Sequence, residues 1–359
     1  MNILAFLEDV FRADDVHDIR VAEDKPLRVK RNDGWHIVPG TVTSRPDIDE
    51  LLKALASEID LKGPVEQALG KRGDKDFGAT IGDYRARGNI FFAGGRKLHL
   101  VIRKFGRIIP DFASLRLPST IVSLLNQSKG LILVTGATGS GKSTTLASGV
   151  DLINKTRPAH IITLEDPVEY IFNEEQATIT QRQVGKDGGS FAEVLRSALR
   201  QAPDVIMIGE LRDAETVHTA LQAANTGHLV LATLHTSSAR QTIERLNSFF
   251  PIAERDWANQ VLSAVLLGVL SQVLIPSLNG QGRQLCYELL VNTTPARENI
   301  KAGKTQALFN VMDQGSRDGQ VLLNKNLLEK ARQGLISVDD ARFFAYDVTG
   351  FDSELQNAY

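Results

Sequence analysis

One motif restricts the fold of this chain more than any other feature of its 359 residues. The pattern G-x-x-x-x-G-K-[ST] is matched in full by the run Gly136, Ala137, Thr138, Gly139, Ser140, Gly141, Lys142, Ser143. An apolar run precedes it at 131–135 and a helical pattern follows it at 144–153. This strand, loop and helix order is the context that a phosphate-binding loop requires. The sequence therefore predicts a nucleotide site inside an α/β domain.

The residue types in this loop each have a role in holding a nucleotide. Glycines let backbone N–H groups wrap a β-phosphate, and the start of the following helix adds a positive dipole. Lys142 can reach the β- and γ-phosphates, and Ser143 can ligate Mg²⁺. We therefore expect the loop, with Thr144 directly after it, to bind ATP together with Mg²⁺.

The remaining pattern divides the chain into two domains. Residues 1–110 mix short β-like and helical runs, with a hairpin turn signature at Asn32-Asp33-Gly34, and predict a small α+β domain. Beyond Thr120, apolar runs alternate with helical patterns, which predicts a mainly parallel sheet flanked by helices. The apolar runs lie at 131–134, 161–164, 205–208 and 229–232. We place an N-terminal domain with its linker at 1–112, and an α/β domain with a C-terminal helical region at 113–359.

Composition excludes several classes of protein. The longest apolar stretch, 261–275, falls short of the ~20 apolar residues that a membrane span needs. The N-terminus has no basic region of a signal peptide, and the single Cys286 excludes a disulfide framework and a multi-cysteine zinc site. We expect a cytoplasmic protein. The net charge of −2 gives no general nucleic-acid signature, but residues 71–110 hold ten Lys and Arg against three Asp.

Three further segments carry candidate chemistry. Glu210 closes an acidic, apolar, acidic run, and a carboxylate after a strand beside the phosphate-loop strand can hold Mg²⁺ or orient water. Glu165 is the first of three carboxylates that follow another apolar run. His228 and His235 flank a third apolar run. Taken singly, each segment also fits an ordinary structural role, as a polar strand end, a solvated turn or a structural histidine.

The four segments together, in this order, resemble the secretion ATPases of type IV pilus and type II secretion motors. The family pattern is a Walker A loop, an aspartate box, a Walker B segment with glutamate, and a histidine box. These correspond here to the phosphate loop, ITLEDPVEY, PDVIMIGELRD and GHLVLATLHT. The resemblance implies a hexameric ring of subunits. Each would join a PAS-like N-terminal domain by a flexible linker to a RecA-like P-loop ATPase domain, with ATP between the two.

The resemblance also implies roles for particular residues. Glu210 becomes the Walker B glutamate and Glu165 the aspartate-box carboxylate, one polarising the attacking water while the other supports Mg²⁺. The sequence leaves open which is which, and we favour Glu210 as the base. His228 and His235 occupy the histidine box. The segment Tyr84–Asn89 resembles a family segment whose arginines approach the phosphates. The resemblance therefore makes three cations in or near it candidate arginine fingers that offset charge on the γ-phosphate, namely Arg85, Arg87 and Arg96.

Within the family the chain most resembles the PilT-type retraction ATPases. It begins almost directly with the PAS-like domain, and it has only Cys286 where assembly ATPases commonly carry a four-cysteine zinc module. The resemblance implies a homo-hexameric motor that powers type IV pilus retraction by pilin disassembly at the cytoplasmic face of the inner membrane. It would associate peripherally and act on an inner-membrane platform protein.

Three alternatives remain. One is an assembly or secretion ATPase of a related type II or type IV system. A second is a nucleic-acid motor, which the aspartate and histidine boxes disfavour, so we expect no nucleic-acid partner. A third is an ATP-gated adaptor that does not hydrolyse ATP, which Glu165 and Glu210 disfavour.

Overall fold

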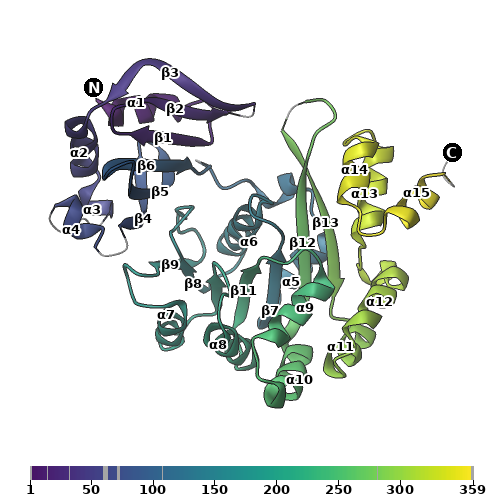
Figure 1. Ribbon diagram of the computed structural model, residues 1–359. Coiled ribbons are helices and arrows are strands. Elements are labelled where there is room, and N and C mark those ends of the chain that lie inside the picture. The colour runs from purple at the N-terminus through teal and green to yellow at the C-terminus, as the bar shows by residue number, and fades with distance from the viewer. Residues whose placement is uncertain are drawn as a thin grey trace. The chain divides into compact units, whose positions relative to one another are not determined.

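The computed structural model describes residues 2–13, 15–31, 33–59, 64–70, 73–106, 108–280 and 282–356. The chain forms two compact units (Figure 1). Unit 1 comprises residues 1–109 together with 166–171, and unit 2 comprises 110–165 and 172–359. The sequence did not indicate the return of 166–171 to unit 1, because six residues carry too little pattern to show where they pack.

Unit 1 is built on an antiparallel sheet with the strand order β3-β2-β1-β6-β5-β4. Its strands are β1 (Asp18–Ala22), β2 (Lys25–Arg31), β3 (Gly34–Thr43), β4 (Asp74–Ile81), β5 (Tyr84–Ala93) and β6 (Lys97–Lys104), and its helices are α1 (Ile3–Val10), α2 (Arg45–Ala54), α3 (Ala56–Ile59) and α4 (Val65–Ala68). The predicted hairpin is confirmed as β2 and β3, although Asn32 of its turn lies outside the described residues. Apolar side chains of α1, α2 and one sheet face share a core, among them Leu7, Ile48 and Ile102.

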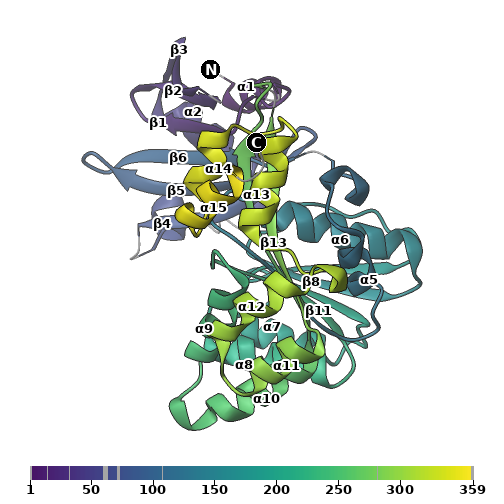
Figure 2. The ribbon, with the colours of Figure 1, turned by 90° about the vertical axis from the view of Figure 1, so that its right-hand side faces the viewer.

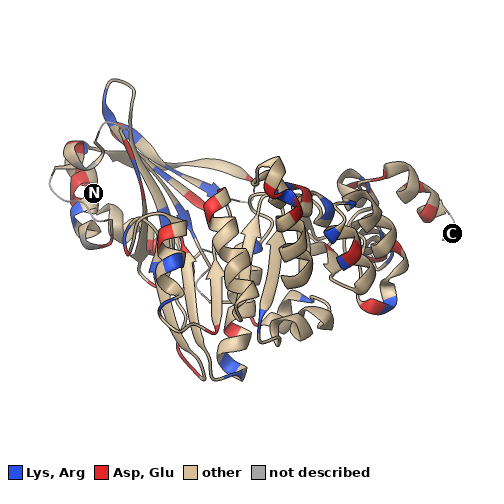
Figure 3. Cartoon of the chain, turned by 90° about the horizontal axis from the view of Figure 1, so that it is seen from below, with Lys and Arg blue, Asp and Glu red and all other residues tan. Residues whose placement is uncertain are grey.

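The other face of this sheet is basic. Cross-strand partners share a face in an antiparallel sheet, so the pairs Arg20–Arg28 and Arg87–Arg103 lie on the same side. In Figure 3, several Lys and Arg positions are blue on the strands of unit 1. The predicted basic segment 71–110 thus combines with cations of β1 and β2, which the sequence did not connect with it. Three of its cations lie outside the described residues, namely Lys71, Arg72 and Arg107.

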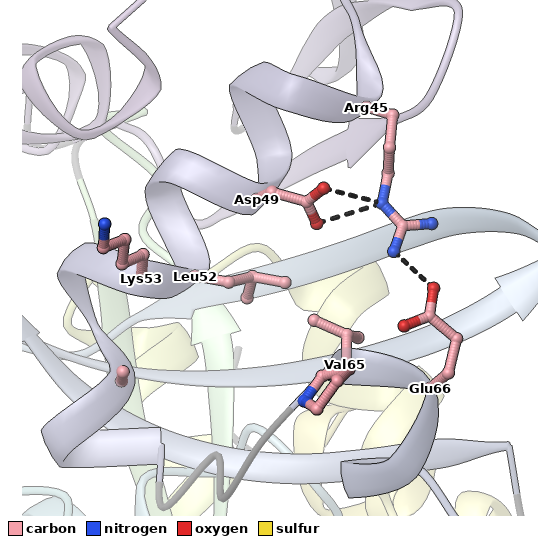
Figure 4. A pocket seen from close by; sticks show the side chains of 8 residues that line it. Arg45, Asp49, Leu52, Lys53, Val65 and Glu66 are labelled. Atoms are coloured by element: carbon pink, nitrogen blue, oxygen red, sulfur yellow. Dashed lines mark hydrogen bonds and ion pairs between the residues drawn. The ribbon is translucent and has the colours of Figure 1, made fainter.

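A pocket of about 320 Å³ lies among the helices of unit 1 (Figure 4). Its polar wall is made by Arg45, which donates to Asp49 over 3.0 Å and to Glu66 over 2.6 Å. Leu52 and Val65 supply apolar lining. None of the residues predicted from the sequence as site residues lines it.

Unit 2 is built on a seven-stranded sheet with the order β13-β12-β7-β11-β10-β8-β9 (Figures 1 and 2). All neighbouring strands pair in parallel except β12 and β13. The strands are β7 (Gly130–Thr135), β8 (His160–Glu165), β9 (Thr178–Gln183), β10 (Val205–Ile208), β11 (Leu229–Leu234), β12 (Leu266–Pro276) and β13 (Arg283–Val291). The predicted mixed α/β class with a mainly parallel sheet is confirmed.

The helices of unit 2 connect these strands and extend the chain beyond them. They are α5 (Ser119–Leu125), α6 (Lys142–Thr156), α7 (Phe191–Ala198), α8 (Ala214–Asn225), α9 (Ala239–Ser248), α10 (Arg255–Val265), α11 (Thr294–Lys301), α12 (Leu308–Gln314), α13 (Leu323–Arg332), α14 (Val338–Phe344) and α15 (Val348–Gln356). Every residue of β7, β10 and β11 is buried, which explains why these strands read as continuous apolar runs. The C-terminal helices begin with α13, which packs on β13 (Figure 2).

A buried carboxyl in unit 2 predicts a dependence of stability on pH. Glu288 on β13 is 4% exposed, and burial raises its pKa from an ordinary value of 4.5 to about 7 even though the backbone N–H of Ala239 donates to it. The folded state therefore binds this proton more tightly than the unfolded state. As a result, its contribution to the free energy of unfolding is full below pH 4.5 and is lost as pH rises towards 7.

We expect Glu288→Gln to remove this dependence, because the amide does not ionise. Between pH 5 and pH 8, the free energy of unfolding of wild type should fall relative to that of the variant by about 3 kcal/mol. Urea unfolding at both pH values measures it. A difference that stays constant with pH would contradict the assignment.

Candidate functional site

Four parallel strands bring the predicted segments of unit 2 to one edge of its sheet. The phosphate loop follows β7, His235 follows β11, Glu210 follows β10, and Glu165 ends β8. These strands are neighbours in the order β7-β11-β10-β8. The strand beside β7 is therefore β11, so Glu210 follows the second strand away and Glu165 the third. At about 4.8 Å per strand, the strand of Glu210 lies roughly 10 Å from β7 and the strand of Glu165 roughly 14 Å.

Glycines of the phosphate loop adopt backbone conformations with positive φ. Gly136 has φ 145°, and a Cβ there would lie 2.3 Å from the carbonyl oxygen of Gln272 on β12. The buried Lys142 begins α6, and its Nζ donates to the carbonyl oxygens of Gly136 over 2.9 Å and Ala137 over 3.0 Å. Backbone donors, a helix N-terminus and an ammonium group thus surround one concave loop, which suits it to a polyphosphate.

Gln272 is a second support of the loop that sequence patterns did not single out as a site residue. Its Nε2 donates to the carbonyl oxygen of Ser140 over 2.7 Å, and the residue is 4% exposed. Because Gln272 lies far from the loop in the chain, only the pairing of β12 with β7 places it there.

Glu165 is buried and accepts hydrogen bonds from a hydroxyl and an amide. It is 6% exposed, and its Oε1 accepts from Thr163 Oγ1 over 2.7 Å and from Gln181 Nε2 over 3.3 Å. Thr163 lies two residues earlier on β8, and Gln181 is paired with Thr163 on β9. Donors fixed on two strands hold this carboxylate in one orientation.

Glu210 has an arginine and a histidine as partners, and it has greater access to solvent. Arg212 Nε donates to its Oε2 over 2.7 Å, and His235 Nε2 lies 3.4 Å from its Oε1. Its side chain is 23% exposed. The structure therefore brings Glu210 and His235 together, and adds Arg212, which no spacing rule indicated.

His228 lies away from this cluster. It precedes β11 at the end where Leu229 pairs with Gly130, whereas the phosphate loop follows the other end of β7. Its Nδ1 is 2.9 Å from the carbonyl oxygen of Ala223 near the end of α8. The six residues of β11 separate the two histidines by roughly 20 Å, so His228 and His235 do not form one site.

The candidate arginines are also divided within unit 1. Arg85 and Arg87 lie near the start of β5, where Arg85 pairs with Glu58 over 3.0 Å and Arg87 lies 3.5 Å from Asp76. Arg96 lies in the turn after β5, over the ring of Phe92. The length of β5 separates Arg96 from Arg85 by roughly 30 Å, so these two cannot contact the same phosphate group.

Donors of the site also fit the cofactors expected from the sequence. The Ser143 hydroxyl is exposed in the first turn of α6, and Glu210 and Glu165 present carboxylates at the same edge of the sheet. Hydroxyl and carboxylate oxygens are the ligands that Mg²⁺ prefers. A phosphate-loop motif at the carboxyl edge of a mainly parallel sheet, with carboxylates at the ends of β10 and β8, defines the class as a P-loop ATPase.

Comparisons with known proteins agree with this class and identify the family. A family model described as type II/IV secretion system protein matches residues 114–337, and the chain belongs to that family. Uncharacterized protein YggR of Escherichia coli strain K12 is 42% identical over 290 residues, which are 80% of this chain and 87% of that protein. The type IV pilus retraction ATPase PilT of Pseudomonas aeruginosa is 44% identical over 214 residues, which are 60% of this chain and 62% of PilT.

A solved structure extends the similarity over both units. The crystal structure of the pilus retraction motor PilT with bound ADP has a TM-score of 0.87, with 38% identity over 99% of each chain. The predicted resemblance to PilT-type secretion ATPases is thereby confirmed, and the protein is a nucleotide-binding ATPase. Within the described part of the chain, the structure has no helix with the length and apolar character needed to cross a bilayer.

Proposed function

We propose that this protein is a Mg²⁺-dependent ATP-hydrolysing motor that powers type IV pilus retraction. The observation that carries the proposal is its similarity to the PilT retraction motor along 99% of both chains. The phosphate loop and the carboxylates at the sheet edge supply the chemistry that such a motor needs.

In the proposed reaction the chain orients ATP and a water molecule. The loop amides and Lys142 would bind the β- and γ-phosphates, while Ser143 would hold Mg²⁺, which neutralises charge on the phosphate oxygens. Glu210 would accept the proton of the attacking water. We favour it over Glu165 because its strand is nearer the phosphate loop and because its side chain is more accessible. Glu165 would then support Mg²⁺ or the water network.

Arg87 is the better of the two candidate fingers on β5. Its side chain is 38% exposed, whereas that of Arg85 is 14% exposed and is engaged by Glu58, Thr80 and Val168. We expect Arg87→Ala to lower kcat by about 10³-fold, the low end for arginine fingers, while the Kd for ATP changes little. Steady-state turnover and titration with a fluorescent nucleotide measure the two quantities.

Arg28→Ala is the matched control, because Arg28 lies on the same sheet face through its pairing with Arg20. It should keep wild-type kcat. If Arg87→Ala also keeps wild-type kcat, alone and combined with Arg85→Ala, neither residue is a finger.

The motor would act as a homo-hexamer at the cytoplasmic face of the inner membrane. It would associate with the membrane only peripherally, through an inner-membrane platform protein, and convert hydrolysis into pilin disassembly. The same family model covers type II secretion, so an assembly or secretion motor is the second candidate.

Deletion of the gene in its own host separates these candidates. Retraction predicts excess surface pili that do not retract and a loss of twitching, restored by the wild-type gene but not by Lys142→Ala. Absent pili, or a secretion defect with normal pili, would overturn the retraction assignment. Size-exclusion chromatography with light scattering, with and without ATP, tests the hexamer.

A further inference from the structure

We propose that Gln181 is a positioning residue that links the Glu165 carboxylate to the backbone of Phe172. The inference rests on the proposed function of Glu165, and it adds a residue that the sequence motifs do not contain. Gln181 would hold Glu165 in its working orientation as long as its hydrogen bond to Phe172 is kept.

The geometry of Gln181 is specific to an amide. Its Oε1 accepts from the backbone N–H of Phe172 over 3.1 Å, and its Nε2 donates to Glu165 Oε1 over 3.3 Å. The backbone N–H can only donate, so the amide oxygen must face Phe172 and the NH₂ group must face Glu165. The amide oxygen of this side chain on β9 therefore binds a backbone N–H group, and its NH₂ group orients a carboxylate.

The two residues that Gln181 joins flank the segment 166–171, which belongs to unit 1. Glu165 is the last residue of unit 2 before this segment, and Phe172 is the first residue of unit 2 after it. Within unit 1, Arg85 Nη2 donates to the carbonyl oxygen of Val168 over 3.4 Å. Gly78 leaves room for Pro167, because a Cβ at Gly78 would lie 2.9 Å from Pro167 Cβ. The segment is thus held by β4 and β5, the hairpin that carries the candidate fingers.

Phe172 directly follows this held segment in the chain. If the Phe172 N–H shifts, the Gln181 amide must either follow it or lose one of its hydrogen bonds. Either outcome changes the set of donors around a carboxylate that is 6% exposed and has little solvent to compensate. Gln181 would thus make the orientation of Glu165 depend on the position of the Phe172 backbone.

Two substitutions test the hydrogen bonds of the Gln181 amide oxygen and of its NH₂ group. Gln181→Leu has similar volume and removes both hydrogen bonds, and we expect kcat for ATP hydrolysis to fall about tenfold with the KM for ATP within about twofold. Gln181→Glu keeps an acceptor for Phe172 but donates to Glu165 only when the introduced carboxyl is protonated. The ratio of its kcat to that of wild type should therefore rise as pH falls from 8 to 6.

Gln201→Leu is the control, because Gln201 is an exposed glutamine whose side-chain Nε2 lies 3.4 Å from Ser197 Oγ. It should match wild type in kcat, KM and thermal unfolding. Wild-type kcat for Gln181→Leu, or a ratio for Gln181→Glu that does not change with pH, would overturn the proposal.

Hydrogen exchange measured by mass spectrometry tests the contact without relying on activity. Gln181→Leu should speed exchange in the peptide that contains Phe172 and leave exchange in the phosphate loop unchanged. Unaltered exchange at Phe172 would refute the link even if the enzyme were slow. If Gln181→Leu speeds exchange at Phe172 but the wild-type protein does not hydrolyse ATP, the proposed function is refuted. The hydrogen bond between Gln181 and Phe172 is supported in that case.

Discussion

Lys142→Ala is expected to abolish measurable ATP hydrolysis, with a loss in kcat of at least about 10³-fold. The Lys142 ammonium is 8% exposed, and its two carbonyl partners belong to the loop that would surround the β-phosphate. No other residue of the phosphate-loop motif carries a positive charge, so truncation leaves the γ-phosphate without its nearest ammonium group. A coupled assay for ADP release measures the rate.

Lys155→Ala provides the matched control for this change. Lys155 lies on the same helix, α6, and its ammonium pairs with Asp151 near the surface. We expect it to keep wild-type kcat, with stability within about 0.5 kcal/mol. Turnover by a folded Lys142→Ala variant at the rate of wild type would disprove the nucleotide site.

Glu210→Gln has the second largest expected effect. Removing a general base that accepts a proton from water costs about 10²–10⁴ in rate, and the amide keeps the size of the side chain. Because Glu210 lies beyond the loop that binds phosphates, the Kd for ATP should change little. A rapid-mixing experiment with the variant should therefore show bound ATP without release of phosphate.

The control and the rival assignment use the same measurement. Glu215→Gln changes an exposed carboxylate on α8 whose partner is Arg196, and it should leave kcat unaltered. Glu165→Gln identifies the rival base. If it stops phosphate release while Glu210→Gln turns over normally, the roles of the two carboxylates are the reverse of those proposed.

Part of this site could be predicted from the sequence alone, because the residues that define it are close together in the chain. The phosphate loop needs glycines at fixed spacings, a lysine and a hydroxyl within eight consecutive residues, and all of them are adjacent in the chain. Glu165 and Glu210 could be marked for the same reason, since each directly follows an apolar run. The arginine group shows the limit of this reasoning. Arg85 and Arg96 belong to one basic segment, yet the extended strand between them separates them by roughly 30 Å.

The sequence by itself determined the phosphate loop, the mainly parallel sheet and the strands that end in carboxylates, because each depends on residue types a few positions apart. Only the tertiary structure decided which of these residues meet. The strand order β7-β11-β10-β8 places the strand of Glu210 closer to the loop than the strand of Glu165. The pairing of β8 with β9 sets Gln181 between Glu165 and Phe172. Strand order depends on how whole layers pack, and no local spacing in the chain encodes it.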